Sequence, residues 1–472
     1  MSFPAQSLRR PAHAGATSRA LLLAGLGLYA LFTAAEFTGF GPLPLGELRI
    51  PGSLALSFVP LALYLALRHP LLFPFGAYLF TVPVDSLLLN SSGATAARLV
   101  AVVAAGVLGM HILARRELRK PGIAWFAWLA VTTWAGLSMA WSIDTASTAL
   151  LFGTILQLFL LTTILAVYPA SKADITAILA TVVASGIFAA CYGLVGFFSG
   201  RVYGTGVSRL SLRTDSGLIV DPNAFATSFV LPIALAFAAL SSSRSVPVRV
   251  LSGLSIVLMM VGVLLSGSRG GLLATLLVLA YYMVRGRQRA LTLALGAAGL
   301  GLSAFFPTVW ARFATDDGAA GSGTGRTFIW ATGLRTFKEH FLAGSGFGTY
   351  GAVYDKNFFG VYQQVFQGWT RPGHSLIVSS LVELGVIGLV VILTAWFLTF
   401  RQMRDIRRGS SYYPIRIALE AALVGLFYEA LTIDTLYIKY YWLAFALVLM
   451  VAAAGRKERS EAQAVAEQPA PD

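Results

Sequence analysis

Long apolar stretches separated by short polar ones run through almost the whole chain. Stretches such as residues 256–265 and 386–393 contain no charged residue. Such runs are typical of helices that span a lipid bilayer. We expect up to about fourteen of them, at residues 20–37, 50–67, 70–89, 95–113, 122–141, 148–168, 173–199, 222–241, 247–265, 269–284, 289–306, 375–400, 413–430 and 436–454.

Two pairs of these stretches, 50–67 with 70–89 and 247–265 with 269–284, are short and tightly joined. If one pair is a re-entrant element, the chain crosses the membrane about twelve times. The predicted fold is therefore all-α, a polytopic transmembrane helical bundle of about 12–14 spans.

Composition supports a single membrane-embedded domain over residues 20–454. Of the 472 residues, 57% are hydrophobic and only 12% are charged, whereas soluble domains carry about 25% charged residues. Residues 1–19 are predicted to be a cytoplasmic tail. Residues 455–472 are polar and rich in Ala, Glu and Gln, and we expect a disordered cytoplasmic tail there. Cys191 is the only cysteine, which excludes an intramolecular disulfide and a cysteine metal site.

The positive charges indicate the orientation of the bundle. The net charge is +14, but most of the basic residues flank apolar stretches, so they are interpreted as topology signals and not as a nucleic-acid surface. Basic clusters occur at 114–120, 285–289, 401–408 and 456–459. An even number of predicted spans separates each from the next, which places all four on one side, the cytoplasm. Residues 201–221 and 307–374 then lie outside.

The outer segment 307–374 is long enough to be functional. A glycine-rich stretch, 316–325, is followed by Trp330, Leu334, Phe337 and Phe341 at spacings of four, three and four. This periodicity predicts an amphipathic helix on the membrane surface or on the bundle.

Three arginines on the predicted outer side depart from the positive-inside pattern: Arg213, Arg269 and Arg326. Guanidinium groups bind phosphate oxygens bidentately and stay charged at any relevant pH. Near a membrane surface, such a cluster suits a lipid-linked diphosphate. The alternative for each is a side chain that snorkels to the interface or pairs with an outer carboxylate. Asp221 and Asn223, which follow Arg213 closely, are candidates for a supporting role, as are Trp330 and Glu383.

His374 lies where the long outer segment meets the next predicted span. An imidazole has an unperturbed pKa near 6.5 and can take a proton from an attacking hydroxyl. The alternative is a polar cap at a helix start. No metal site is expected, since the first outer loop offers only Glu47 as an acid and hard divalent ions need several oxygen ligands. If a metal is used, Asp221, Asp355 and Asp434 are the first candidates.

Together these motifs resemble the O-antigen ligase and O-antigen polymerase superfamily, and most of all the ligase. The resemblance runs from Arg213 to about residue 389. Its pieces are 213–217 with 221–226, 268–270, Arg326 with Trp330, 344–348, 374–376, and Glu383 with 384–388. One departure is clear, because the family often has an asparagine after its histidine and this chain has Ser375.

The resemblance implies a metal-independent glycosyltransferase of the bacterial inner membrane with a periplasmic site and no cofactor. The donor would be an O-antigen chain on undecaprenyl diphosphate and the acceptor a sugar hydroxyl of lipid A-core, with membrane lipids as further partners. By the same analogy, His374 activates the acceptor and the arginines hold the diphosphate. A polymerase and a protein O-oligosaccharyltransferase remain open, as does a transporter of the lipid-linked glycan. A transporter would place charges near the membrane midplane, where most predicted spans have none.

Overall fold

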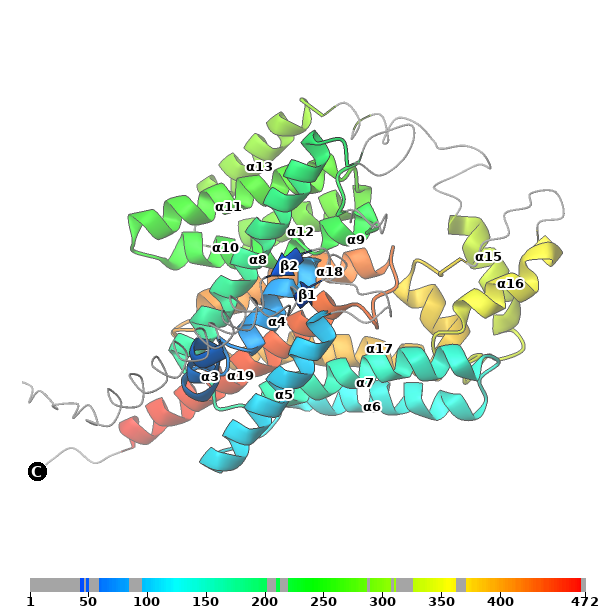
Figure 1. Cartoon of the computed structure of the whole chain (residues 1–472), viewed down its shortest axis with the longest axis horizontal. Helices are drawn as coiled ribbons and strands as arrows, with labels where there is room; N and C mark the ends of the chain where they lie inside the picture. The colour runs from blue at the N-terminus through cyan, green and yellow to red at the C-terminus, as the bar shows by residue number, and fades with distance from the viewer. Residues whose placement is uncertain are drawn as a thin grey trace, which may run out of the picture.

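The computed structural model describes residues 43–45, 48–50, 59–84, 96–201, 209–212, 220–286, 289–306, 310, 326–361 and 371–467. Long helices lie side by side in one bundle, and a pair of shorter helices stands beyond one of its ends (Figure 1). A single hairpin accompanies them: β1 (Leu43–Leu45) runs antiparallel to β2 (Leu48–Ile50), with Leu43 opposite Ile50.

The helices of the first half are α3 (Val59–Arg68), α4 (Phe75–Thr81), α5 (Ala96–Arg115), α6 (Ile123–Leu137), the 3-10 turn η2 (Ser138–Ala140), α7 (Thr145–Val167), α8 (Lys172–Phe198), α9 (Pro222–Thr227) and α10 (Val230–Ser242). Those of the second half are α11 (Val246–Leu265), α12 (Arg269–Arg285), α13 (Arg289–Ser303), α15 (Arg326–Phe337), α16 (Tyr350–Val361), α17 (Leu376–Gln402), the 3-10 turn η3 (Met403–Asp405), α18 (Tyr413–Ala430) and α19 (Lys439–Ala466).

Seven stretches of the described chain are helical, long and apolar enough to cross a membrane. They lie at Ala97–Ala114, Ile123–Ala140, Thr145–Val167, Lys172–Phe198, Pro222–Ser242, Val246–Leu265 and Leu376–Asp405. Each coincides with a stretch predicted from the apolar pattern, so the all-α polytopic membrane class is confirmed. The total of about 12–14 spans stays a prediction, and residues 20–37 lie outside the described residues.

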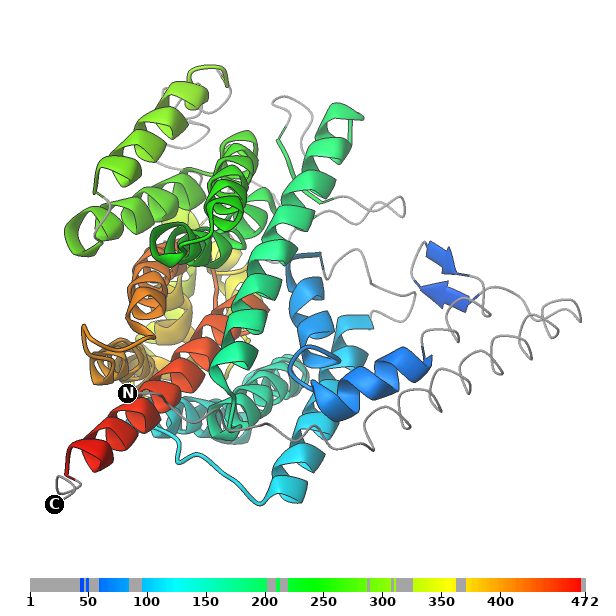
Figure 2. The same ribbon diagram turned by 90° about the vertical axis from the view of Figure 1, so that its left-hand side faces the viewer.

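The centre of the bundle is formed by α10, α18 and the first half of α19. Nearly every side chain of α10 is buried, and α18 packs against both α10 and α12 while α19 packs against α7. Helix α10 is apolar on all sides, as expected for a helix surrounded by other helices, whereas α18 also carries the buried Glu420 and Glu429. Aromatic rings fill the centre, where Trp128 stacks on Phe445 with centroids 4.1 Å apart. Figure 2 shows α3–α5 along one side of the bundle and α11–α13 along the other, with α8 between them.

Basic segments far apart in the sequence meet at one end of the bundle, which we call the basic end. Arg456 Nη1 lies 3.0 Å from Asp405 Oδ2, and its Nη2 donates to the carbonyl of Lys120 at 3.5 Å. Arg119 in turn donates to the carbonyl of Ala170 at 2.6 Å. The prediction that the basic segments around 114–120, 401–408 and 456–459 share one face is therefore confirmed, although the compartment they face stays a prediction.

The expected disordered tail from residue 455 is wrong for most of its length, because α19 continues to Ala466. The Ala, Glu, Gln, Lys and Arg residues of this segment are all strong helix formers. Tertiary contacts also hold it, since the Glu458 carboxylate accepts hydrogen bonds from the Ser410 hydroxyl and from the Ser411 N–H at 3.1 Å. Polar composition alone does not separate such a docked helix from a disordered tail.

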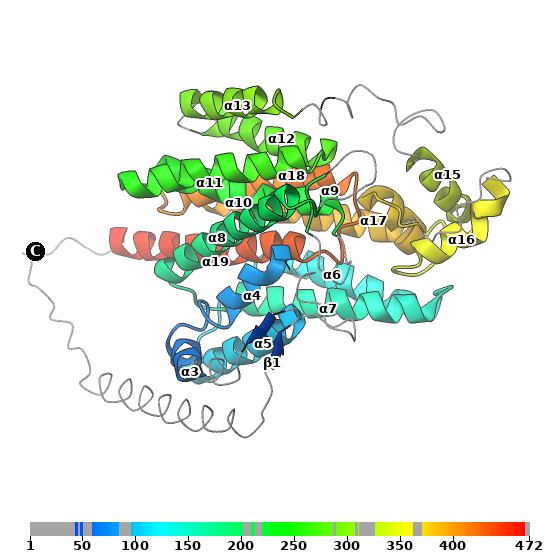
Figure 3. The same cartoon turned by 45° about the horizontal axis from the view of Figure 1, so that its top comes forward.

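The pair α15 and α16 stands at the end of the bundle opposite the basic end, against the start of α17 (Figure 3). Ile329, Tyr350, Val353 and Phe358 form a small apolar core there, with Trp330 partly buried against it. The predicted helix is confirmed over Arg326–Phe337, but its buried face consists of Ile329, Thr332, Gly333 and Thr336, and the predicted stripe of Trp330, Leu334 and Phe337 is only partly buried. Phe341 lies beyond its end and is exposed.

Candidate functional site

The backbone of His374 is held in an unusual conformation just before α17. Its φ is +50°, in the left-handed region that residues other than glycine seldom adopt. Its N–H donates to Asp434 Oδ2 at 3.0 Å. Such a conformation persists only when its surroundings fix it, and it clusters at functional sites. The next residue, Ser375, caps α17 by accepting from the N–H of Val378, so the cap role considered for the histidine belongs to its neighbour.

Gly373 ties the histidine to α15. Its carbonyl accepts a hydrogen bond from Trp330 Nε1 at 2.9 Å. A Cβ at this position would overlap Ser379 Oγ and lie 2.9 Å from the Tyr350 ring, so a larger residue would displace these side chains. The Tyr350 hydroxyl donates to the carbonyl of Ile329 at 2.8 Å. The predicted supporting residue Trp330 thus fixes the position of α15 relative to the His374 backbone.

Asp434, in the connection between α18 and α19, is the carboxylate that organises this corner. It accepts hydrogen bonds from the His374 N–H, from the Ser379 hydroxyl and from Tyr437. The side chain is only partly buried. Through these hydrogen bonds it links the loop before α17, α17 itself and the α18–α19 connection.

The electrostatics of the site favour a neutral imidazole. Burial lowers the pKa of His374 below its ordinary value; the charges of Asp434 and Asp221 oppose this shift, and those of Arg326 and Arg371 reinforce it. Four charged residues from four separate segments therefore act on one imidazole. A neutral imidazole with a lowered pKa is able to accept a proton near neutral pH.

Arg269 opens α12 at the same end of the bundle. The Ser268 hydroxyl caps this helix by accepting from the N–H of Gly271 at 3.1 Å. Gly270 lies against the end of α18, where a Cβ would stand 2.5 Å from Glu429 Oε2. Glu429 is fully buried and accepts a hydrogen bond from the Thr227 hydroxyl at 2.9 Å. The charges of Arg326 and Asp221 act on Glu429 as well as on His374. The start of α12, which lies against Glu429, is therefore part of the same electrostatic environment as His374.

Asp221 and Asn223 have structural roles at the start of α9. Asp221 caps this helix by accepting from the N–H groups of Asn223 and Ala224. Asn223 Oδ1 accepts from Arg209 Nη2 at 3.0 Å, and Arg209 Nε donates to the carbonyl of Ser266 at 2.7 Å. Arg209 therefore ties the segment before α9 to the α11–α12 turn that presents Arg269.

Glu383 supports the site from inside α17. This helix is interrupted at Gly385, where φ is +69°, and the segment 341–348 packs against the interruption. The buried carboxylate of Glu383 accepts hydrogen bonds from the N–H of Gly348 at 2.9 Å and of Tyr350 at 3.2 Å. It thereby fixes the glycine-rich turn that leads into α16.

The structure thus brings Arg326, Asp221 and His374 together, and it places the start of α12 beside Glu429. Arg213 lies outside the described residues. Three residues near the site, Arg209, Arg371 and Glu429, are not predicted from the sequence, and Asp434 is predicted only as an alternative metal ligand. Arg371 and Asp434 lie in predicted outer connections, and this location could have identified them as candidate site residues. Glu429 lies inside a predicted span, where an ionisable residue is itself a functional signal.

Comparison with known proteins adds one finding. Residues 254–393 match the family described as O-antigen ligase. This part of the chain is similar to the O-antigen ligase superfamily. The predicted resemblance is therefore confirmed. No curated protein matches the chain.

The O-antigen ligase domain, as matched, contains Arg269, Arg326, His374 and Glu383, whereas Asp434 and the α9 cap lie outside its bounds. The superfamily includes both ligases and polymerases of O-antigen. Within the described residues, no three His, Cys, Asp or Glu side chains are grouped so as to hold a metal ion; metal independence stays a prediction.

Proposed function

We propose that this protein is an O-antigen ligase that transfers a glycan from undecaprenyl diphosphate to a sugar hydroxyl of lipid A-core. The observation that carries the proposal is the placement of His374. Its backbone is fixed by Asp434, and its imidazole lies within the electrostatic influence of Arg326. A proton acceptor beside a permanent cation suits the attack of a neutral hydroxyl on a donor that carries a diphosphate.

The acceptor hydroxyl oxygen forms a bond with the anomeric carbon of the donor, while the bond from that carbon to the diphosphate oxygen breaks. The imidazole of His374 takes the hydroxyl proton, and undecaprenyl diphosphate leaves with the electron pair. General-base catalysis of this kind contributes roughly 10²–10⁴-fold to the rate.

Arg326 and Arg269 are proposed to hold the diphosphate, with Arg213 as the third member of the set. Arg326 acts electrostatically on both His374 and Glu429, and Arg269 begins the helix that packs beside Glu429 through Gly270. Guanidinium groups can neutralise the charge that develops on the leaving oxygen.

Because the arginines neutralise the diphosphate, the proposed reaction needs no metal, and activity will survive EDTA. Loss with EDTA and recovery with magnesium or manganese would contradict this.

The proposed site faces the periplasm of the bacterial inner membrane. This follows from the basic end, which the positive-inside rule assigns to the cytoplasm, and from the position of His374 at the other end of the bundle. Undecaprenyl-linked glycan, lipid A-core and membrane lipids are the proposed partners.

The decisive experiment incubates purified protein in EDTA with undecaprenyl-diphosphate-linked glycan, alone and together with lipid A-core. A ligase yields glycan joined to lipid A-core and requires the acceptor. A polymerase lengthens the lipid-linked glycan without lipid A-core. Transport of intact donor across vesicles, with no new glycosidic bond in either reaction, would establish a transporter and overturn the proposal.

A further inference from the structure

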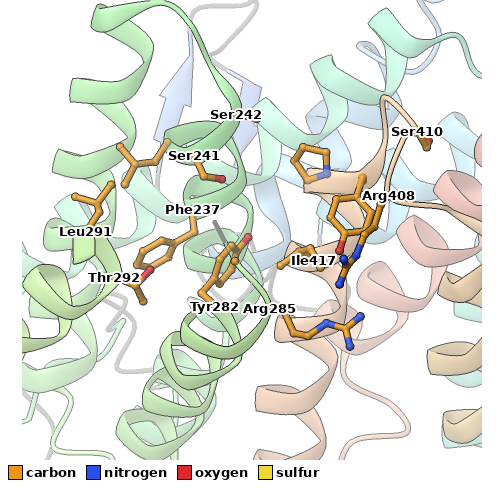
Figure 4. Close-up of a pocket in the computed structure, with 14 residues that line it drawn as sticks. Phe237, Ser241, Ser242, Tyr282, Arg285, Leu291, Thr292, Arg408, Ser410 and Ile417 are labelled. Atoms are coloured by element: carbon orange, nitrogen blue, oxygen red, sulfur yellow. The ribbon is translucent and has the colours of Figure 1, made fainter. Parts of the chain in front are cut away.

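A cavity of about 320 Å³ lies at the basic end, between the ends of α10 and α12 and the beginnings of α13 and α18. Figure 4 shows the side chains that line it. It is far from His374, because α12 begins with Arg269 at the site and ends with Arg285 at the cavity. Seventeen helical residues span about 25 Å. The cavity is therefore separate from the proposed catalytic site.

One wall of the cavity is apolar and rigid. Phe237 of α10 stacks on Tyr282 of α12 with ring centroids 5.1 Å apart. The Tyr282 hydroxyl is already used, since it donates to the carbonyl of Ala234 at 2.9 Å. Leu291 and Ile417 complete this wall. It therefore offers carbon surface to a ligand.

The other wall carries two arginines. Arg285, from the last turn of α12, and Arg408, from the connection before α18, both line the cavity, and Figure 4 shows their guanidinium groups on the side next to α18. In the part of the chain that the structure describes, neither is in a salt bridge: the carboxylates nearby are taken by Arg416, 2.8 Å from Glu420, and by Arg456. Within the described residues, neither guanidinium group is thus in direct contact with a carboxylate.

We propose that this cavity binds the headgroup phosphate of an anionic phospholipid in the membrane leaflet at the basic end. Two guanidinium groups match a phosphate diester, and basic pockets between membrane helices on the cytoplasmic side are suited to such headgroups. The apolar wall distinguishes a lipid from a soluble phosphate, which would gain nothing from Phe237 and Leu291. Val284 and Leu293, the sequence neighbours of the lining residues Arg285 and Thr292, are 70% and 59% exposed, and we expect them to contact the acyl chains.

The test measures binding and not glycan transfer, so its outcome is independent of the proposed function. Purified protein is titrated with phosphatidylglycerol in a neutral detergent, and the bound lipid is counted by native mass spectrometry. Phosphatidylcholine and inorganic phosphate serve as parallel probes. We expect retention of phosphatidylglycerol alone and a higher melting temperature in its presence.

The double variant Arg285→Gln/Arg408→Gln should weaken phosphatidylglycerol binding about tenfold or more, because two charge-assisted contacts are lost. The matched control Arg249→Gln/Arg407→Gln removes the same charge from exposed residues at the same end that do not line the cavity, and it should bind as wild type does. A variant that fills the space, Thr292→Trp, should also lose the lipid while keeping both arginines. Equal binding by the arginine pair and its control, or an equal effect of inorganic phosphate, would overturn the proposal.

Discussion

His374 has two separate properties, a fixed backbone and a titratable side chain, and substitutions can separate them. Glutamine retains a hydrogen-bonding side chain but cannot accept a proton. If His374 is the base, His374→Gln loses roughly 10²–10⁴-fold in transfer rate while donor binding stays unchanged. Rates are measured with purified enzyme and lipid-linked donor. A glutamine variant near the wild-type rate would restrict the histidine to orienting the acceptor.

The pH profile follows from the lowered pKa of His374. The neutral imidazole is the active form, and it is lost only when the pH falls through a pKa that lies below 6.5. The acid limb of kcat/KM should therefore lie below pH 6.5, lower than an unperturbed histidine would give. A profile with its acid limb above pH 6.5 contradicts the described surroundings of the imidazole.

Asp434 is expected to act as a positioning residue through His374. Asparagine keeps an oxygen for the His374 N–H but removes the charge that raises the pKa of the imidazole. Asp434→Asn should thus slow transfer and move the acid limb further down in pH. Asp434→Ala also removes the hydrogen bond and should be slower still. A purely structural role would reduce the rate without moving the pH profile.

The proposed role of Arg326 and Arg269 is tested by replacing each with lysine, which keeps the positive charge but changes the geometry of the donor groups. Lysine lacks the planar fork that binds phosphate bidentately. Arg326→Lys and Arg269→Lys should each weaken donor use by roughly tenfold or more. Arg335→Lys is the matched control, since Arg335 is an exposed residue of the same helix as Arg326. Donor affinity equal to wild type in both variants would remove the arginines from the diphosphate site.

Among the elements, the interruption of α17 matters most for the site. Gly344 has a φ of +73°, and a Cβ there would overlap the backbone of Glu383. Gly344→Ala should therefore destabilise the protein by about 1–2 kcal/mol for the backbone conformation alone, with more for the overlap. Gly253→Ala, in the middle of α11 with open space around it, should not lower the melting temperature. Equal melting temperatures would show that the segment before α16 does not need its glycine.

The helices could be predicted from sequence because each apolar run is a local property of the chain. The break in α17 at Gly385 could not be predicted, because it depends on contacts with a segment distant in sequence. There the carbonyl groups of Phe341 and Leu342 accept hydrogen bonds from the N–H groups of Val386 and Ile387. For the same reason, His374 could be nominated from its place between loop and span, whereas its contact with Asp434 joins residues sixty positions apart. Long-range pairing of this kind leaves no periodic signal.

For the whole molecule, orientation decides which compartment the site faces. The basic segments converge at one end and His374 lies at the other, so the positive-inside rule predicts opposite compartments for the two. Cys191, the only cysteine, is exposed and is first replaced by alanine. Single cysteines are then introduced at Lys338, just after α15, and at Gly409, in the exposed connection before α18.

An impermeant thiol reagent added to intact spheroplasts should label the cysteine at position 338 and spare the one at 409. Permeabilisation should expose both to the reagent, which controls for local accessibility. The physical basis is the positive-inside rule, by which short arginine-rich loops stay in the cytoplasm, whereas long segments such as the one that contains α15 cross the membrane largely regardless of their charge. The reverse pattern would turn His374 towards the cytoplasm. It would then face a compartment in which a periplasmic ligase cannot meet lipid A-core, and the proposed function would fail even if the catalytic chemistry survived.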